Sequence, residues 1–177
     1  MGDLLEKGHC ETNQLNYGLL WRGVEHEILP LCRANDIGLI CYSPLAQGLL
    51  TDRYGSADEV PDGLARTRLY SKERPNATHG EDGCEEEVFE ALGVIREICK
   101  GVGESMATCS LAWMKQRAGV ASVLVGARSP EELAWNEPAI NLKLSDDVID
   151  DLSAATERVK EKIGLNPDPW MVPSRMR

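Results

Sequence analysis

The sequence has little positive charge. It contains 19 Lys and Arg residues against 29 Asp and Glu residues, which gives a net charge of −10 at pH 7. Nucleic acids and anionic membranes bind basic surfaces. We therefore expect no nucleic-acid partner and no membrane partner. A phosphate site would have to be built locally, from a few arginines and backbone N–H groups.

The patterns of disulfide-rich and metal-binding proteins are also missing. None of the 6 cysteines forms a C-x-x-C pair, and the 3 histidines have no ligand spacing beside them. We expect reduced, mostly buried thiols and no metal site. No apolar run is long enough to span a membrane, and we expect no signal peptide. These absences predict a cytoplasmic protein.

The chain does contain alternating strand and helix patterns. Residues 39–42 form an uncharged apolar run that favours a strand buried on both faces, and Ser43-Pro44 ends it. Residues 120–125 are apolar and β-branched, and Gly126 follows them. The predicted helices cover residues 24–35, 85–100, 105–117 and 144–163. Gly101 and Gly103 are expected to break the second of these, and Ser105 and Ser129 are predicted helix caps. This order of strands and helices is typical of the βα repeats of a parallel sheet.

Two segments show no periodic pattern. Residues 55–84 form a long loop that carries basic side chains, and we predict either a solvated surface loop or a cover over a polyanionic cofactor. The basic side chains of this loop are Arg66, Arg68, Lys72 and Arg74. Residues 166–177 are proline-rich, which predicts an irregular tail.

Three motifs together resemble one known family. The motifs are Gln14-Leu15-Asn16-Tyr17, then Tyr42-Ser43-Pro44-Leu45-Ala46-Gln47-Gly48-Leu49-Leu50, then Gly126-Ala127-Arg128-Ser129-Pro130-Glu131-Glu132-Leu133 with Asn136. Together they resemble motifs of the aldo-keto reductases. They follow in the family's order, which is far more specific than any one motif. The resemblance implies an α/β fold, a partial TIM (β/α)8 barrel with strands 6 to 8 and their helices, in which residues 10–17 also form a strand. Residues 1–177 would form the C-terminal, cofactor-binding portion.

The resemblance also implies the cofactor site. Gln14 would hydrogen-bond the nicotinamide carboxamide, and Tyr42 would stack on the nicotinamide ring. Arg128, between a strand end and a predicted helix start, would bind the 2′-phosphate of NADP. The alternative for Arg128 is a surface arginine that pairs with Glu131 or Glu132. Asn136 would bind adenine. The other implied cofactor-binding residues are Ser43, Pro44, Leu45, Gly48, Arg53, Gly126 and Glu132.

Glu132 affects which cofactor is expected. The family usually has glutamine or arginine there, and a carboxylate would repel the 2′-phosphate. The resemblance therefore implies NADPH, with NADH possible because of Glu132.

No position matches the family's catalytic aspartate, tyrosine, lysine and histidine, which come from the first half of the barrel, so no catalytic residue is assigned. Residues 1–8 read as the end of a helix, which suggests a cut start and a missing N-terminal half. The implied activity is reduction of aldehydes or ketones, with a small carbonyl substrate, but we expect the isolated chain to be inactive. The missing half or an oligomer partner would complete the protein.

Other readings stay open at this point. The first alternative is a non-catalytic nucleotide-binding or regulatory subunit of the same fold. The second is a gene fragment without function, and the third is part of a phosphate-binding barrel enzyme of another class.

Overall fold

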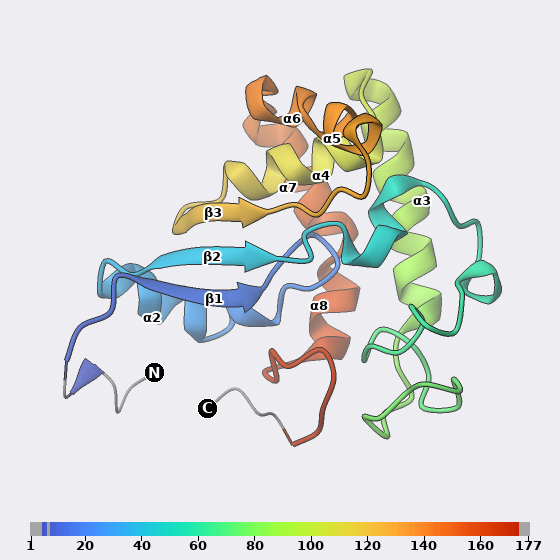
Figure 1. The fold of residues 1–177 in the computed structure, drawn as a ribbon, viewed down its shortest axis with the longest axis horizontal. Helices are drawn as coiled ribbons and strands as arrows, with labels where there is room; N and C mark the ends of the chain where they lie inside the picture. The colour runs from blue at the N-terminus through green and yellow to red at the C-terminus, as the bar shows by residue number, and fades with distance from the viewer. Residues whose placement is uncertain (1–4, 7, 174–177) are drawn as a thin grey trace.

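The computed structural model of the protein describes residues 5–6 and 8–173. Most of the helix end predicted over residues 1–8 lies outside them. The described chain contains one sheet of three parallel strands in the order β1-β2-β3. The strands are β1 (Thr12–Asn16), β2 (Gly38–Tyr42) and β3 (Val120–Leu124). The three arrows in Figure 1 point the same way, so their carboxyl ends share one edge region.

The two faces of this sheet differ in burial. Leu39 and Cys41 of β2 are fully buried, whereas Gly38, Ile40 and Tyr42 are only partly buried. The expectation that both faces of this strand are buried is therefore wrong. Helices contact the strands, as α2 (Ile28–Ala34) does with β2 and α4 (Met106–Lys115) with β3. Successive side chains of a strand point to opposite faces, so one face carries the core and the other stays open.

The first three helices follow their local signals. The predicted helix 24–35 is divided into a short 3-10 turn, η1 (Gly23–Glu25), and α2, whose first turn contains Pro30. Helix α3 (Glu85–Val102) begins with three glutamates and ends at Gly103, whose φ of 83° is left-handed. Gly101, predicted to break this helix, lies inside it. Helix α4 is capped by Ser105, whose side chain accepts the N–H of Thr108.

The predicted last helix is broken in two at Thr156. Helices α7 (Asp146–Ala155) and α8 (Glu157–Ile163) meet there, and the Thr156 backbone is not helical (φ −108°, ψ 7°). The Arg22 guanidinium donates to the Ser153 carbonyl oxygen (2.6 Å) and to the Thr156 hydroxyl (3.1 Å). Glu25 pairs with Arg22 at 2.8 Å. The break is thus held by residues that lie more than 130 positions away in the sequence.

Two short helices follow β3, α5 (Pro130–Asn136) and α6 (Pro138–Asn141). Two further 3-10 segments, η2 (Ala46–Thr51) and η3 (Ala57–Glu59), lie between β2 and α3. No helix or strand follows Ile163 within the described residues. In Figure 1, η2 and the loop 55–84 lie beyond the tips of the strands.

Candidate functional site

The open face of the sheet brings Gln14 and Tyr42 close together. Gln14 pairs in register with Ile40, and Asn16 pairs with Tyr42. Gln14 and Tyr42 therefore point to the same face of the sheet, and Tyr42 lies two positions after the residue that pairs with Gln14. Gln14 is exposed and Tyr42 is partly exposed. A carboxamide offers both a donor and an acceptor, and an aromatic ring offers a flat apolar surface, so this face suits a planar ligand that carries an amide.

The chain that leaves β2 has an unusual backbone. Within the described residues, five non-glycine residues have positive φ, and four of them lie in this segment. They are Ser43 (54°), Ala46 (47°), Gln47 (57°) and Asp52 (60°), and Gly48 (98°) lies among them. Each such non-glycine residue costs about 1–3 kcal/mol, and such residues cluster where a chain is shaped around a ligand.

Close packing fixes the start of this segment. A Cβ added to Gly18 would lie 2.8 Å from the carbonyl oxygen of Pro44, so only glycine lets the two chain segments that follow β1 and β2 approach this closely. Pro44 is buried, and Leu45 and Gly48 are partly buried. The backbone of residues 43–48 is therefore held against the ends of two strands.

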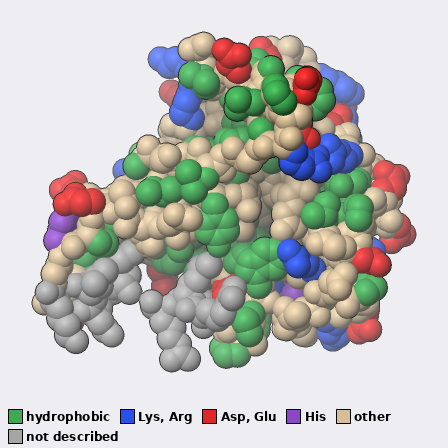
Figure 2. Space-filling model, in the orientation of Figure 1, with side chains coloured by type: hydrophobic (Ala, Val, Ile, Leu, Met, Phe, Trp, Pro, Cys, Tyr) green, Lys and Arg blue, Asp and Glu red, His purple; other side chains and the backbone are tan. Residues whose placement is uncertain are grey.

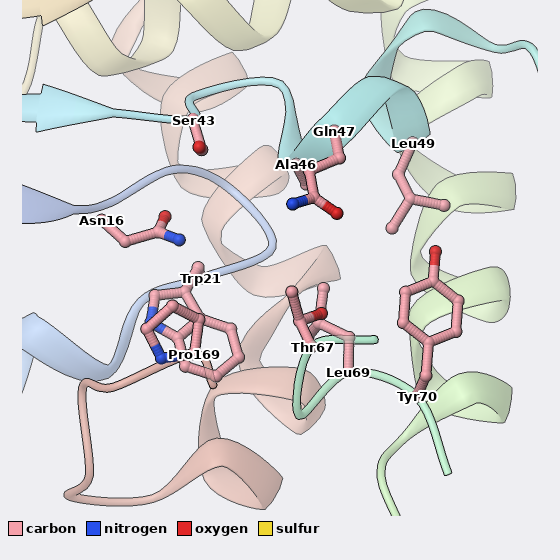
Figure 3. A pocket seen from close by; sticks show the side chains of 10 residues that line it. All are labelled: Asn16, Trp21, Ser43, Ala46, Gln47, Leu49, Thr67, Leu69, Tyr70 and Pro169. Atoms are coloured by element: carbon pink, nitrogen blue, oxygen red, sulfur yellow. The ribbon is translucent and has the colours of Figure 1, made fainter. Parts of the chain in front are cut away.

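A small cavity lies beside this segment. Its volume is about 20 Å³, roughly that of one water molecule. Asn16 Oδ1 and Thr67 Oγ1 are buried polar atoms without a hydrogen-bond partner, and both residues line the cavity. Figure 3 shows the Asn16 and Gln47 carboxamides pointing toward this space. The full lining comprises Asn16, Trp21, Ser43, Ala46, Gln47, Leu49, Thr67, Leu69, Tyr70 and Pro169.

A second polar cluster begins after β3. Arg128 donates to Glu132 from both its side chain and its backbone, and the shortest bonds run from Nη2 to Oε1 at 2.7 Å and from the backbone N–H to Oε2 at 2.8 Å. The Arg128 side chain is 75% exposed and that of Glu132 is 23% exposed. Hydrogen bonds from Arg128 lower the pKa of Glu132, and the nearby Arg53 charge lowers this pKa further. Arg53, which follows η2, therefore lies close to the Arg128–Glu132 pair. Figure 2 shows Lys and Arg side chains gathered on the molecule's face at the strand-tip end.

The rest of this segment follows the predicted pattern. Gly126 is exposed, and the predicted cap is present because Ser129 accepts the N–H of Glu132 at 3.2 Å. Helix α5 has only seven residues and none of them is buried, so its side chains, not its helix end, provide the polar groups. Asn136 lies one turn after Glu132 and is partly buried.

The basic side chains of the loop 55–84 are mostly paired within the protein. Arg68 is 3% exposed and binds Glu81 at 2.6 Å, and it also donates to three backbone carbonyl oxygens. Arg74 pairs with Glu85 at 2.9 Å, and Lys72 pairs with Asp82 at 2.8 Å. Arg66 is exposed, and its guanidinium lies 5.1 Å from the centre of the Trp170 ring. Three of the four cations thus already have partners within the protein.

Sequence reasoning missed two groups of residues at this site. Asn16 was detectable, because it lies two positions after Gln14 in the same strand and so faces the same way. Thr67 and the left-handed residues Ala46 and Gln47 gave no comparable signal, because their positions depend on packing between distant segments.

Other chemistry has little support among the described residues. They contain no group of three or more His, Cys, Asp or Glu side chains that could hold a metal ion. All six cysteines are free thiols, and burial raises the pKa of Cys41, in β2, to about 12. No helix in the part of the chain that the structure describes is long and apolar enough to cross a membrane.

Comparison with known proteins identifies the family. The Aldo/keto reductase family profile matches residues 6–157, and the chain belongs to this family, which confirms the resemblance. It is 34% identical over 144 residues to the NADH-specific methylglyoxal reductase of Escherichia coli (strain K12), which covers 81% of this chain and 41% of that protein. It is also 34% identical over 130 residues to the L-glyceraldehyde 3-phosphate reductase of Escherichia coli O157:H7, covering 73% and 36%. The chain thus spans about two-fifths of the length of these relatives.

Another relative is described as a channel subunit. A probable voltage-gated potassium channel subunit beta of Oryza sativa subsp. japonica is 29% identical over 149 residues, which cover 82% of this chain and 44% of that protein.

Solved structures support the fold. The glycerol dehydrogenase AKR11B4 of Gluconobacter oxydans matches with a TM-score of 0.67 and 22% identity, over 94% of this chain and 46% of that one. A thermostable aldo-keto reductase in complex with epalrestat matches with a TM-score of 0.57 and 21% identity, over 84% and 41%. The α/β class with a partial parallel sheet is therefore confirmed.

Proposed function

We propose that this chain supplies the nicotinamide-dinucleotide site of an oxidoreductase that reduces aldehydes or ketones. The observation that carries the proposal is the shared open face of Gln14 and Tyr42, which lies at the strand ends that also lead to Arg128 and Glu132. Family membership supports NADH or NADPH as the hydride donor. In this proposal β1, β2 and β3 correspond to strands 6 to 8 of a TIM barrel.

Different residues of the site would contact different parts of the cofactor. Gln14 and Tyr42 hold the nicotinamide, and the backbone of residues 43–48 with Arg53 contacts the middle of the dinucleotide. Residues 126–136 hold its adenosine end. The loop 55–84 would cover the cofactor with Arg66, because its other cations already have partners.

Carbonyl reduction would need groups that this chain does not supply. Hydride transfer to a carbonyl leaves an alkoxide that needs a proton donor, and no residue here is assigned that role. We propose that the remaining strands and the proton donor come from a further segment or from another subunit. The six free thiols support a cytoplasmic location.

A second function deserves a test because one relative is described as a potassium channel subunit beta. A nucleotide-binding regulatory subunit would use the same site and would not need turnover. A fragment without function would bind no dinucleotide.

Dinucleotide binding by the 177-residue chain tests the proposal. We expect calorimetry to detect binding of NADH or NADPH, with no oxidation of either when 4-nitrobenzaldehyde is added. Gln14→Leu should weaken binding by about two- to tenfold, the effect of one lost hydrogen bond. Thr12→Val, on the same face of β1, is the matched control and should change nothing. Failure of both dinucleotides to bind would reject the proposed site.

A further inference from the structure

The carboxylate of Glu132 already occupies the groups that a phosphate would need. Its Oε1 atom accepts from Nη2 and Nε of Arg128, at 2.7 and 3.2 Å, and its Oε2 atom accepts the Arg128 backbone N–H. Two side-chain N–H groups and one backbone N–H thus converge on one acidic side chain. This is the forked geometry in which a guanidinium binds a carboxylate or a phosphate.

A ribose 2′-phosphate and a ribose 2′-hydroxyl would interact differently with the Arg128–Glu132 pair. A phosphate on Arg128 would have to displace Glu132 or lie beside its negative charge, and a phosphate carries a charge of about −1.5 to −2 at pH 7. A free ribose diol brings O–H donors, and a carboxylate accepts such donors without leaving the guanidinium. In Rossmann-type domains, which have a different fold, an acidic residue binds the 2′-hydroxyl of NAD, whereas an arginine binds the 2′-phosphate of NADP.

We propose that Glu132 makes this site selective for the dinucleotide with a free ribose 2′-hydroxyl, NADH, over NADPH. Arg128 then serves as a positioning residue, because its hydrogen bonds hold the carboxylate of Glu132 in place. The inference rests on the proposed function, since it takes residues 126–136 as the adenosine end of the site.

The surroundings of the pair agree with this assignment. Glu132, Trp135 and Asn136 are spaced so that they lie on one side of α5. Trp135 is 67% exposed, so its indole is available to a flat base. The carboxylate would thus receive the ribose while an aromatic ring and a carboxamide lie one turn further on.

The adenosine end can be tested without the nicotinamide. The 177-residue chain is titrated by calorimetry with ADP-ribose and with 2′-phospho-ADP-ribose. We expect the wild type to prefer ADP-ribose. Glu132→Gln should shift the affinity ratio toward the phosphorylated ligand by about fivefold, because it removes a like charge from an exposed contact.

Glu131→Gln is the matched control. It removes the same charge one position earlier in α5, and among the described residues Glu131 makes no ion pair with an arginine. It should leave the ratio within about twofold of the wild type, the scale of screened surface charges. Equal melting temperatures would show that both variants fold.

The outcomes separate this inference from the proposed function. If the wild type prefers the phosphorylated ligand, or if Glu132→Gln leaves the ratio unchanged, the role of Glu132 is wrong while the dinucleotide site stands. If neither ligand binds and neither dinucleotide binds, the proposed function fails and the selectivity fails with it.

Discussion

Arg68 and Arg128 each bind a glutamate, yet their surroundings are opposite. The Arg68 side chain is 3% exposed, and that of Arg128 is 75% exposed. Arg68 draws its partners from the loop 55–84 and from residues 163–168, whereas Arg128 binds a residue only four positions further on. The first arginine joins distant segments of the chain, and the second is free of any such task. An arginine can therefore be assigned to a ligand only after its protein partners are known.

Removing Arg68 should have the largest effect on stability. Arg68→Ala leaves the carbonyl oxygens of Ile163, Asn166 and Asp168 without their donor and leaves Glu81 unpaired. We expect a loss of about 3 kcal/mol in the free energy of unfolding, the low end for a broken buried pair because Glu81 is partly exposed. Chemical denaturation followed by circular dichroism measures it.

Arg66→Ala is the control for this prediction. Arg66 lies in the same loop but only stacks over Trp170, so its loss should cost about 0.5–1 kcal/mol. Equal losses in the two variants would contradict the contrast between buried and exposed arginines in this loop.

Lowering the pH should have a smaller effect on the free energy of unfolding. Glu85 accepts hydrogen bonds from the Arg74 guanidinium and from the Ser71 N–H, and the bond from Arg74 is the main cause that lowers its pKa below the usual 4.5. A lowered folded pKa stabilises the fold above about pH 4.5, and this contribution disappears as the pH falls through the folded value. We expect the difference in unfolding free energy between wild type and Glu85→Gln to be largest at pH 6 and to shrink as the pH is lowered below about 4.5. A constant difference across this range would contradict the prediction.

The smallest effect on stability should come from Arg128. Its side chain is mostly exposed and its partner lies on the same short segment, so Arg128→Ala should leave the melting temperature unchanged. Scanning calorimetry of the unliganded chain measures this. A clear drop in the melting temperature would mean that Arg128, like Arg68, supports the fold.

The sequence predicted most elements with a local cause. Ser105 and Ser129 act as helix caps as expected, and the apolar runs at 39–42 and 120–125 form strands. The apolar run also placed Tyr42 in a strand, whereas the family resemblance placed Gln14 in one, and the register of the two strands brings both residues to one face.

The features that the sequence did not predict depend on contacts between residues far apart in the chain. The break at Thr156 depends on Arg22, and the burial of Arg68 depends on residues near the end of the chain. Local patterns contain no information about such partners. The Arg128–Glu132 ion pair, by contrast, spans only four positions, and pairing of Arg128 with Glu131 or Glu132 was the alternative that the sequence offered to a phosphate site.

The Arg68 network also has a mechanical consequence. The Arg68 backbone N–H donates to the Pro169 carbonyl oxygen at 2.9 Å, and Pro169 lines the cavity beside Asn16 and Thr67. The loop and the residues around Pro169 are thus tied together as one body. A movement of the loop that enlarged the cavity would have to carry this part of the tail with it, so the two segments would open as a unit or not at all.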